Sequence, residues 1–263
     1  MRRRVFFVLS VLVALALVAV ILDGNILGQK SQGGPALLFT DGDFEATADG
    51  RGLRATEDSG GWYESRRDTK DGRLQLKLST KTIGGNKTHK AMIKGSAKTN
   101  TYLSQRLQAP QDEPFLVAWD IYVRDVEPGA NRSCFQMLGD DSIKGKGPNA
   151  ASAERFVFLG FENAATSGKL NLIAFEGGKN REWSERTVLV RDLEAKRWYT
   201  ITAAVDPARK TYQVSVDGVT AQPVSVRAFE TKKAGVVRKL THISFASWND
   251  GPGTFYVDNV RRL

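Results

Sequence analysis

The chain has 263 residues, of which 41% are hydrophobic and 25% charged, a composition that is ordinary for a packed globular protein and excludes global disorder. The formal net charge at pH 7 is +9, but the basic residues are scattered and form no stripe with interleaved aromatic residues, which argues against nucleic-acid binding. The single cysteine, Cys134, excludes an intramolecular disulfide. The only two histidines, His89 and His242, have no second histidine or cysteine at ligand spacing, which argues against a zinc site.

The first 25 residues have the pattern of a membrane-targeting segment. Three arginines, Arg2 to Arg4, precede an unbroken apolar run from Val5 to Leu22. The run is about long enough to cross the hydrocarbon core of a membrane as a helix, and longer than the core of a usual signal peptide. The arginines predict that the N-terminus stays in the cytoplasm and that everything after Leu22 is exported. We therefore expect a signal anchor over residues 1–25, with a cleaved signal peptide as the alternative.

Residues 26–36 mix Gly, Gln, Ser and Lys and end in Gly-Gly-Pro, which is typical of a flexible linker. The folded part is expected to begin at Leu37 and to span residues 37–263. This exported part keeps 35 Lys and Arg against 29 Asp and Glu once the three arginines are set aside, so its basic excess is small.

The folded part alternates short apolar stretches with turn residues, and no window of a dozen residues keeps a helical stripe. We predict about eleven or twelve strands, with turn signals at short intervals, in an all-β sandwich or barrel. The clearest of them lie at residues 38–45, 74–78, 102–107, 115–123, 134–138, 155–161, 169–175, 198–205, 211–216, 240–248 and 254–260. The stretch 115–123 is apolar on both faces and is predicted to be a central strand. Ala150–Glu154 and Asp192–Lys196 are each predicted to form at most a single helical turn.

The segment from Trp198 to Val219 gives the strongest fold signal. Tyr199, Ile201, Ala203 and Val205 alternate with more polar residues, as a pleated strand with two distinct faces requires. A second alternating stretch follows at 211–216. The dipeptide Asp217-Gly218 then supplies the positive-φ residues of a two-residue hairpin.

The strand at 198–205, the sequence YQVSVDG at 212–218 and the sequence FYVDNV at 255–260 together resemble the C-terminal half of concanavalin A-like (laminin-G-like) jelly-roll domains. The resemblance extends as a pattern over residues 37–263. It implies two antiparallel sheets stacked as a β-sandwich, with the first and last strands side by side.

The resemblance also implies a metal site. In several jelly-roll carbohydrate-binding modules, acidic residues of the first strand and an Asp of the last strand hold a calcium ion. Asp43, Glu45 and Asp258 match those positions, and carboxylates are suitable ligands for calcium. The alternative is that Asp258 and Asn259 only satisfy backbone groups at a turn.

Two loops carry the residue types that bind sugars. Trp248, Asn249 and Asp250 combine a ring that can stack on a pyranose with planar groups that bond to hydroxyls. The loop from Gly139 to Asn149 has similar chemistry in Asp140, Asp141 and Asn149, and Trp62 is a further candidate for stacking. The alternative for both loops is plain turn chemistry.

Catalysis must be weighed because some members of this fold class are glycanases or polysaccharide lyases. A retaining glycosidase needs two carboxyl groups about 5 Å apart. Glu162, Glu176, Glu182 and Glu185 lie at strand ends or in loops, and none has a second acid two or four residues away within a strand. The residues that lyases of this fold use find no match either, so we assign no catalytic residue.

These observations predict an exported, membrane-tethered, non-catalytic carbohydrate-binding domain on the extracytoplasmic side. Its expected partners are a glycan or polysaccharide, and the membrane through the N-terminal helix, but not nucleic acid; structural calcium is the one expected cofactor. Two alternatives stay open, a polysaccharide hydrolase or lyase of the same fold and an extracellular scaffold or adhesion domain that binds protein.

Overall fold

The computed structural model describes residues 38–46, 60–67, 76–98, 100–127, 132–143, 147–175, 186–225 and 239–263. The contacts of the chain divide it into Met1–Ala36 and Leu37–Leu263, and the described residues belong to the second unit. The predicted membrane-targeting segment and linker lie outside the described residues. Among those described, no helix is both long and apolar enough to span a bilayer.

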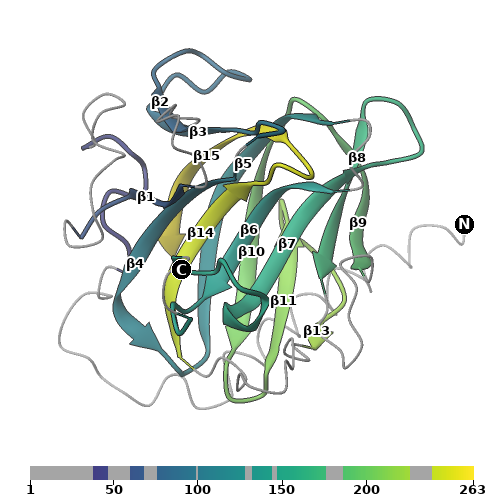
Figure 1. The fold of residues 1–263 in the computed structure, drawn as a ribbon. Helices are drawn as coiled ribbons and strands as arrows, with labels where there is room; N and C mark the ends of the chain where they lie inside the picture. The colour runs from purple at the N-terminus through teal and green to yellow at the C-terminus, as the bar shows by residue number, and fades with distance from the viewer. Residues whose placement is uncertain are drawn as a thin grey trace, which may run out of the picture. The chain divides into compact units, whose positions relative to one another are not determined.

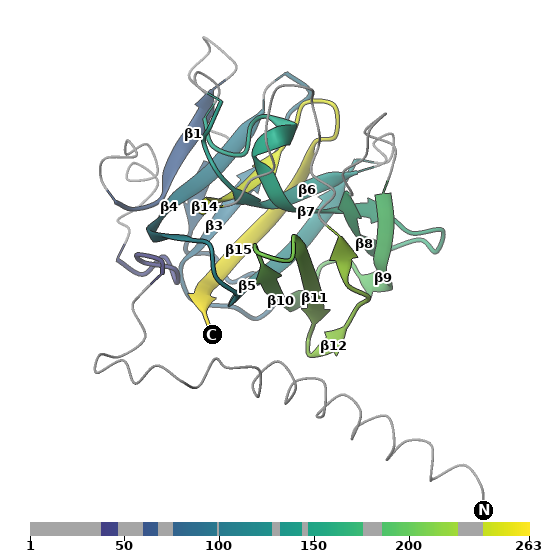
Figure 2. The same cartoon turned by 90° about the horizontal axis from the view of Figure 1, so that it is seen from below.

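The described residues form two antiparallel sheets stacked as a sandwich, as the sequence predicts (Figures 1 and 2). Sheet A has seven strands in the order β1-β4-β14-β6-β7-β8-β9. Their bounds are β1 Tyr63–Arg67, β4 Thr101–Gln111, β14 Leu240–Ser247, β6 Ser133–Gly139, β7 Arg155–Asn163, β8 Lys169–Phe175 and β9 Arg186–Glu194.

Sheet B has eight strands in the order β12-β11-β10-β5-β15-β3-β2, with β13 paired to β11. Their bounds are β12 Val219–Thr220, β11 Thr211–Val216, β10 Trp198–Asp206, β5 Phe115–Val126, β15 Gly253–Arg262, β3 Lys90–Lys94, β2 Leu76–Ser79 and β13 Val224–Ser225. The prediction of a central strand at 115–123 is confirmed, because β5 lies between β10 and β15.

The main core lies between the sheets and follows the period-2 alternation. On β10 the side chains of Tyr199, Ile201, Ala203 and Val205 are buried, and the residues between them are half-buried. Trp119 of β5 meets Phe245 of β14 edge-on across the sandwich, with ring centroids 6.1 Å apart. Burial of these apolar faces is the main stabilising contribution to such a fold.

The predicted two-residue hairpin is confirmed. Asp217 and Gly218 have φ of 48° and 81°, and Val216 pairs with Val219 directly across the turn. Positive φ at both central residues gives the backbone twist that matches the twist of the flanking strands.

The strand predicted at residues 38–45 is wrong. This entry segment is a series of turns and bends with positive φ at Asp41 (48°) and Phe44 (59°), closed by a hydrogen bond from the Phe44 amide to the Asp41 carbonyl. It nevertheless lies beside the last strand, because the Val260 amide donates to the Gly42 carbonyl at 2.8 Å. The turns let the fully buried Phe44 enter the core.

Strands β1, β3, β9, β12 and β13 were not predicted from the sequence. Asp192–Lys196 is not a helical turn: it contains the end of β9 and a turn, with φ of 56° at Asp192 and 61° at Lys196. The single turn predicted at Ala150–Glu154 is present as the 3-10 helix η4 (Ser152–Glu154).

Candidate functional site

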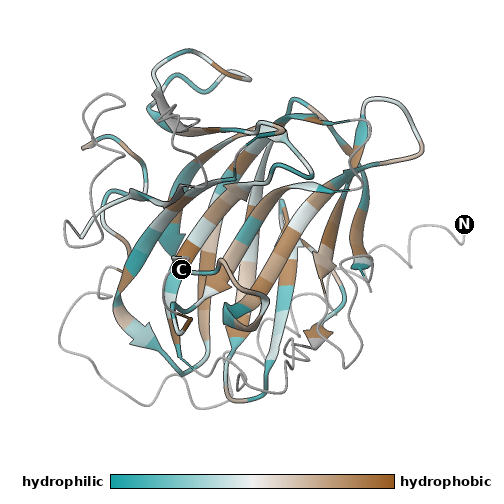
Figure 3. Ribbon diagram, in the orientation of Figure 1, coloured by the Kyte–Doolittle hydropathy of each residue, from teal (hydrophilic) through white to brown (hydrophobic). Residues whose placement is uncertain are grey.

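The outer face of sheet A, which points away from the main core, carries a second hydrophobic cluster. Its aromatic rings are in direct contact: Phe135 stacks on Trp248 at 3.9 Å and Phe158 on Phe175 at 4.3 Å between centroids. Its buried members are Tyr102, Phe135, Met137, Phe158, Ile173, Phe175, Ala246 and Trp248. Hydrophobic residues run through the middle of this sheet in Figure 3, and the lower end of β4 is hydrophilic.

The chain itself covers part of this face. The segment 147–154, which precedes β7, is tied to β14 by a hydrogen bond from Asn149 Nδ2 to Ser244 Oγ at 2.9 Å. At its other end Gly147 lies against β1, where a Cβ would come within 2.5 Å of the Ser65 carbonyl oxygen. The segment therefore crosses sheet A from β14 to β1.

Arg155 connects the covering segment to the aromatic cluster. Its guanidinium donates to the carbonyls of Asn149 and Ala150 at 2.8 and 2.7 Å. The same group lies 4.6 Å from the ring centre of Phe158 and 4.8 Å from that of Trp248. A buried guanidinium over aromatic faces gains cation–π attraction, so Arg155 stabilises both the segment and the cluster.

A polar cavity of about 380 Å³ lies at one end of the outer face, beyond the covering segment. It is formed by β4, the residues after β6 and the start of β14. Its described lining residues are Arg106, Asp140, Asp141, Ser142, Lys239, Thr241 and His242. We call this the β4–β14 pocket.

Two side chains of the β4–β14 pocket that can carry a positive charge come from directly paired positions in sheet A. Arg106 of β4 and His242 of β14 are partners in the β4–β14 register, so both side chains project from the same face. His242 is buried, and its Nδ1 lies 2.8 Å from the Thr241 hydroxyl. The ammonium of Lys239 lies 3.3 Å from Asp112 in an exposed ion pair.

Asp140 is the half-buried acid of the pocket. Its Oδ1 accepts hydrogen bonds from the Ser142 hydroxyl at 3.0 Å and the Ser142 amide at 3.3 Å. Burial raises the pKa of this carboxyl above its ordinary value, and the two Ser142 hydrogen bonds and the nearby His242 oppose that rise.

The backbone around Asp140 is fixed by close packing. The Asp140 amide donates to the Glu154 carbonyl at 2.9 Å, and its carbonyl accepts from the Asn149 amide at 3.0 Å. Gly139 has to be glycine, because a Cβ there would overlap the Glu154 carbonyl oxygen. Of the three residues predicted as ligands in this loop, Asp140 and Asp141 line the pocket, whereas Asn149 is fully buried and donates to Ser244.

Glu154 is a structural carboxylate. It is fully buried, and its two oxygens accept the amides of Ile143 and Ala151, each at 2.8 Å. Burial raises its pKa. Because both oxygens hold backbone donors, Glu154 does not reach a ligand in the pocket.

The second predicted sugar loop lies at the opposite end of β14. Trp248 lies six positions after His242, which corresponds to about 20 Å along a strand. Trp248 is only 7% exposed, and its ring is covered by Phe135 and Arg155. The backbone amide of Asn249 donates to Asn100 Oδ1 at 2.8 Å, and Asp250 lies 3.7 Å from Arg132. The two predicted loops therefore do not form one site.

Trp62 is placed in the main core and not at a surface. It is 2% exposed, packs on Phe44 at 5.1 Å and donates from Nε1 to the Asp41 carbonyl at 2.8 Å. Neither face of its ring is open to a sugar.

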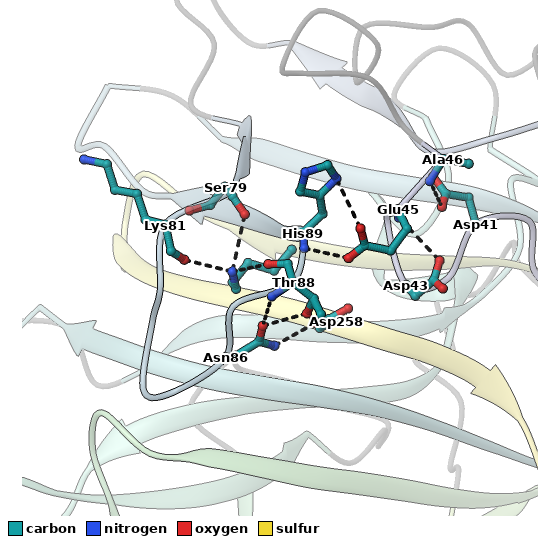
Figure 4. A network of polar contacts seen from close by, with 11 residues as sticks. Asp41, Asp43, Glu45, Ala46, Ser79, Lys81, Asn86, Thr88, His89 and Asp258 are labelled. Carbon is teal, nitrogen blue, oxygen red and sulfur yellow. Dashed lines mark hydrogen bonds and ion pairs between the residues drawn. The ribbon is translucent and has the colours of Figure 1, made fainter.

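The three residues proposed for calcium lie near one another, where the entry segment meets β15 (Figure 4). Asp43 and Glu45 line a cavity of about 420 Å³ together with Lys87, Thr88, His89 and Asn259. The Glu45 carboxylate accepts from the His89 amide at 2.7 Å, and its other oxygen lies 3.6 Å from His89 Nδ1.

Asp258 is bonded to protein donors on both oxygens. Its Oδ2 accepts from Asn86 Nδ2 at 2.7 Å and Thr88 Oγ1 at 3.0 Å, and its Oδ1 from the Asn259 amide at 2.8 Å. Within the described part of the chain, no group of three or more His, Cys, Asp or Glu residues could hold a metal ion. In this arrangement the residues do not fit a calcium site.

Sequence reasoning missed Arg106, Lys239, Thr241 and His242 as pocket residues. The available signal was alternation: Arg106 follows Tyr102 and Ser104 on one face of β4, and His242 lies opposite Ile243 on β14. The pairing of β4 with β14, which brings the two together, is not visible in the sequence.

Comparison with known proteins supports the fold and gives no family. No protein-family model matches the chain, and no curated protein matches its sequence. A sialidase structure aligns with a TM-score of 0.53 and 14% identity, over 86% of this chain and 18% of the sialidase, so the likeness covers a small part of that enzyme. A structure reported with endo-acting O-glycanases of human gut microbiota aligns with a TM-score of 0.53 and 12% identity over 84% of this chain and 96% of the other.

The catalytic domain of a glycoside hydrolase family 131 protein from Coprinopsis cinerea aligns with a TM-score of 0.50 and 14% identity, over 86% of this chain and 94% of that domain. The fold is the concanavalin A-like jelly roll. The resemblance seen in the sequence is thereby confirmed at the level of architecture. At these identities the likeness does not assign an activity.

Proposed function

We propose that the protein is an exported, membrane-tethered, non-catalytic carbohydrate-binding domain, and that its glycan site is the β4–β14 pocket. The observation that carries the proposal is the cross-strand pair Arg106 and His242, which with Asp140 lines a polar cavity on the outer face of sheet A. Guanidinium, imidazole, carboxylate and hydroxyl groups together donate to and accept from sugar hydroxyls. Because the described lining holds no Phe, Tyr or Trp ring, recognition rests on hydrogen bonds and charge.

The engagement of the nearby acids supports binding without turnover. Glu154 holds two backbone amides, and Glu162 on the same sheet is paired with Arg186 and accepts from Asn171 at 3.1 Å. Acid–base cleavage of a glycosidic bond uses two carboxyl groups that can reach opposite sides of that bond. In the pocket, Asp140 and Asp141 are adjacent in sequence and share one loop.

A glycan array probed with the detergent-solubilised full-length protein tests the proposal. Binding to at least one glycan class is expected, and Arg106→Ala and Asp140→Asn are each expected to weaken it about tenfold, since each removes a hydrogen bond to a charged group. Arg209→Ala is the matched control, because Arg209 is an exposed arginine in the turn between β10 and β11. Glycan binding that neither Arg106→Ala nor Asp140→Asn weakens contradicts the assignment of the glycan site to the pocket. Absence of any glycan binding by folded protein contradicts the function and favours a protein-binding scaffold.

One observation favours the alternative of a hydrolase or lyase. Burial raises the pKa of Asp140, although His242 opposes the rise, and a raised carboxyl pKa is the kind of perturbation that acid–base catalysts show. Incubation of the protein with polysaccharides, followed by assays of new reducing ends and of unsaturated uronate absorbance, decides between the readings. Product formation that Asp140→Asn abolishes establishes the enzyme. Glycan binding without product supports the binding domain.

The location of the domain is tested separately. Cell fractionation followed by protease treatment of intact cells or spheroplasts is expected to find the protein in the membrane fraction with residues 37–263 accessible. Recovery of the protein in the soluble cytoplasmic fraction contradicts the tethered, extracytoplasmic placement.

A further inference from the structure

Lys90 is a fully buried lysine at the start of β3, with 0% of its surface exposed. Lysine side chains in folded proteins almost always keep the ammonium in water, and a fully buried charge is retained only where polar groups replace the lost hydration. The ammonium of Lys90 therefore depends on the polar groups around it.

Three backbone carbonyls accept hydrogen bonds from the ammonium of Lys90. Lys90 Nζ donates to the Lys81 carbonyl at 2.9 Å, to the Ser79 carbonyl at 3.4 Å and to the Thr88 carbonyl. An ammonium has three hydrogens to donate, so each one has an acceptor. Carbonyl oxygens of this kind also replace water around bound metal cations.

Two carboxylates add a negative field. Burial lowers the pKa of Lys90, while the charges of Asp258 and Glu45 oppose that fall and favour the ammonium. These are two of the three acids that the sequence resemblance assigns to calcium. They come from β15 and from the entry segment, and both accept hydrogen bonds from the loop between β2 and β3.

The conformation of the loop between β2 and β3 holds these three carbonyls in place. Ser79 and Lys90 are paired at its base, and Ile83 and Asn86 exchange two backbone hydrogen bonds at its tip, at 3.0 and 2.9 Å. Gly84 at the tip has φ of +52°, and a Cβ there would come within 2.6 Å of the Tyr122 ring. The tip is anchored on sheet B by a hydrogen bond from Trp198 Nε1 to the Ile83 carbonyl at 2.7 Å.

The same loop is bonded to both neighbouring segments. Asn86 and Thr88 donate to Asp258 of β15, and the His89 amide donates to Glu45 of the entry segment. The ammonium therefore lies where three segments meet: the entry segment, the β2–β3 loop and β15.

We propose that the ammonium of Lys90 is an internal structural cation that takes the place expected for calcium, and that its three carbonyls form a latent site that accepts a free alkylammonium ion when the lysine is shortened. The domain then carries its own cation at this junction. Its stability does not depend on calcium.

The variant Lys90→Ala in the full-length protein tests the proposal. Removing the charge leaves three carbonyls and Asp258 without their cation, and a fall in the melting temperature of about 10 °C is expected. Propylammonium has the shape of the deleted atoms, so adding it is expected to restore part of the loss. The measurement is thermal unfolding of wild type and variant with and without propylammonium, with sodium at equal ionic strength as the reference.

Two variants control for packing and for unspecific salt effects. Lys94→Ala removes an exposed lysine from the same strand, and neither a fall nor a response to propylammonium is expected. Lys90→Met fills the space without a charge, so it is expected to be destabilised but not rescued. Rescue of Lys90→Met to the same extent, or no rescue of Lys90→Ala, contradicts the proposal.

Measurements on the wild type keep the proposal testable if Lys90→Ala does not fold. Nitrogen-15 NMR of lysine ammonium groups is expected to show one slowly exchanging signal that Lys94→Ala retains. Addition of calcium or of a chelator is expected to leave the melting temperature of the wild type unchanged. Absence of a protected ammonium signal, or stabilisation of the wild type by calcium at micromolar to millimolar concentrations, overturns the proposal.

Discussion

The side-chain amide of Asn149 donates to the hydroxyl of Ser244 at 2.9 Å, and this bond ties the covering segment to the outer face of sheet A. Ser244 continues the contact across the sheet, because its hydroxyl lies 2.8 Å from that of Ser104, which in turn lies 2.8 Å from that of Ser65. A line of hydrogen bonds therefore runs from the covering segment over β14 and β4 to β1. It satisfies buried polar groups beneath the covering segment.

Two substitutions of Asn149 separate its hydrogen bond to Ser244 from its left-handed backbone conformation. Asn149 has φ of 57° and is fully buried, so Asn149→Ala loses the bond to Ser244 and also strains the backbone. We expect this variant to lower the free energy of unfolding by about 2 kcal/mol. Asn149→Gly relieves the strain alone and is expected to cost less. Urea denaturation of both checks the order, and an equal loss for the two variants contradicts the contribution of the left-handed conformation.

Gly139→Ala is expected to disrupt the pocket. A Cβ at this position overlaps the Glu154 carbonyl oxygen, which is backbone and cannot rotate away. The strand end must shift, and overpacking of this kind costs about 1–3 kcal/mol. Gly61→Ala is the matched control, because a Cβ there has open space around it and φ is not positive. Thermal unfolding that shows equal stability for both variants contradicts the packing described at Gly139.

Asp140→Asn is expected to raise stability at neutral pH and not at acid pH. The folded-state pKa of Asp140 lies above its ordinary value of 3.8, so the folded protein holds this proton more tightly than the unfolded chain. The stabilising contribution is present below the unfolded pKa and is lost as pH rises through the folded pKa. An asparagine stays neutral throughout and avoids that loss. Melting temperatures of wild type and variant measured from acid to neutral pH check the sign, and a difference that does not change with pH contradicts it.

Trp248 is expected to act through packing. Its ring stacks on Phe135 and lies beneath Arg155, so Trp248→Ala leaves a cavity in the outer-face cluster and is expected to cost about 3 kcal/mol. Trp248→Phe keeps a stacked ring and is expected to cost less. Unfolding free energies and glycan binding measured on both variants test this, because loss of glycan binding by a stably folded Trp248→Phe restores the sugar-stacking role predicted from the sequence.

Period-2 alternation and turn chemistry are local signals, and they predicted the elements that depend on them. The hairpin at Asp217-Gly218 and the buried face of β10 follow directly from residues adjacent in the chain. The entry segment was mistaken for a strand because Phe44 reaches the core through a turn, which alternation does not reveal.

Only some of the residues of the candidate site could be predicted from the sequence, for a different reason. Asp140 and Asp141 stood out as a polar loop, whereas Arg106 and His242 become neighbours only through the register of β4 with β14. Likewise, Trp248 has the composition of a sugar-binding loop, and only the packing of Phe135 against it shows that its ring is covered. The register between strands far apart in the sequence depends on the whole fold, so it could not be predicted from local patterns in a single sequence.

The position of β15 has a consequence for the order in which the molecule is assembled. Residues 253–262 form the strand between β5 and β3, so until they are available both of those strands have an open edge and the Lys90 junction lacks Asp258. Sheet B is therefore completed late, by contacts between segments far apart in sequence, which is the slow kind of folding. A chain that has emerged only as far as residue 252 therefore exposes two unpaired strand edges, and such edges are templates for pairing with other chains.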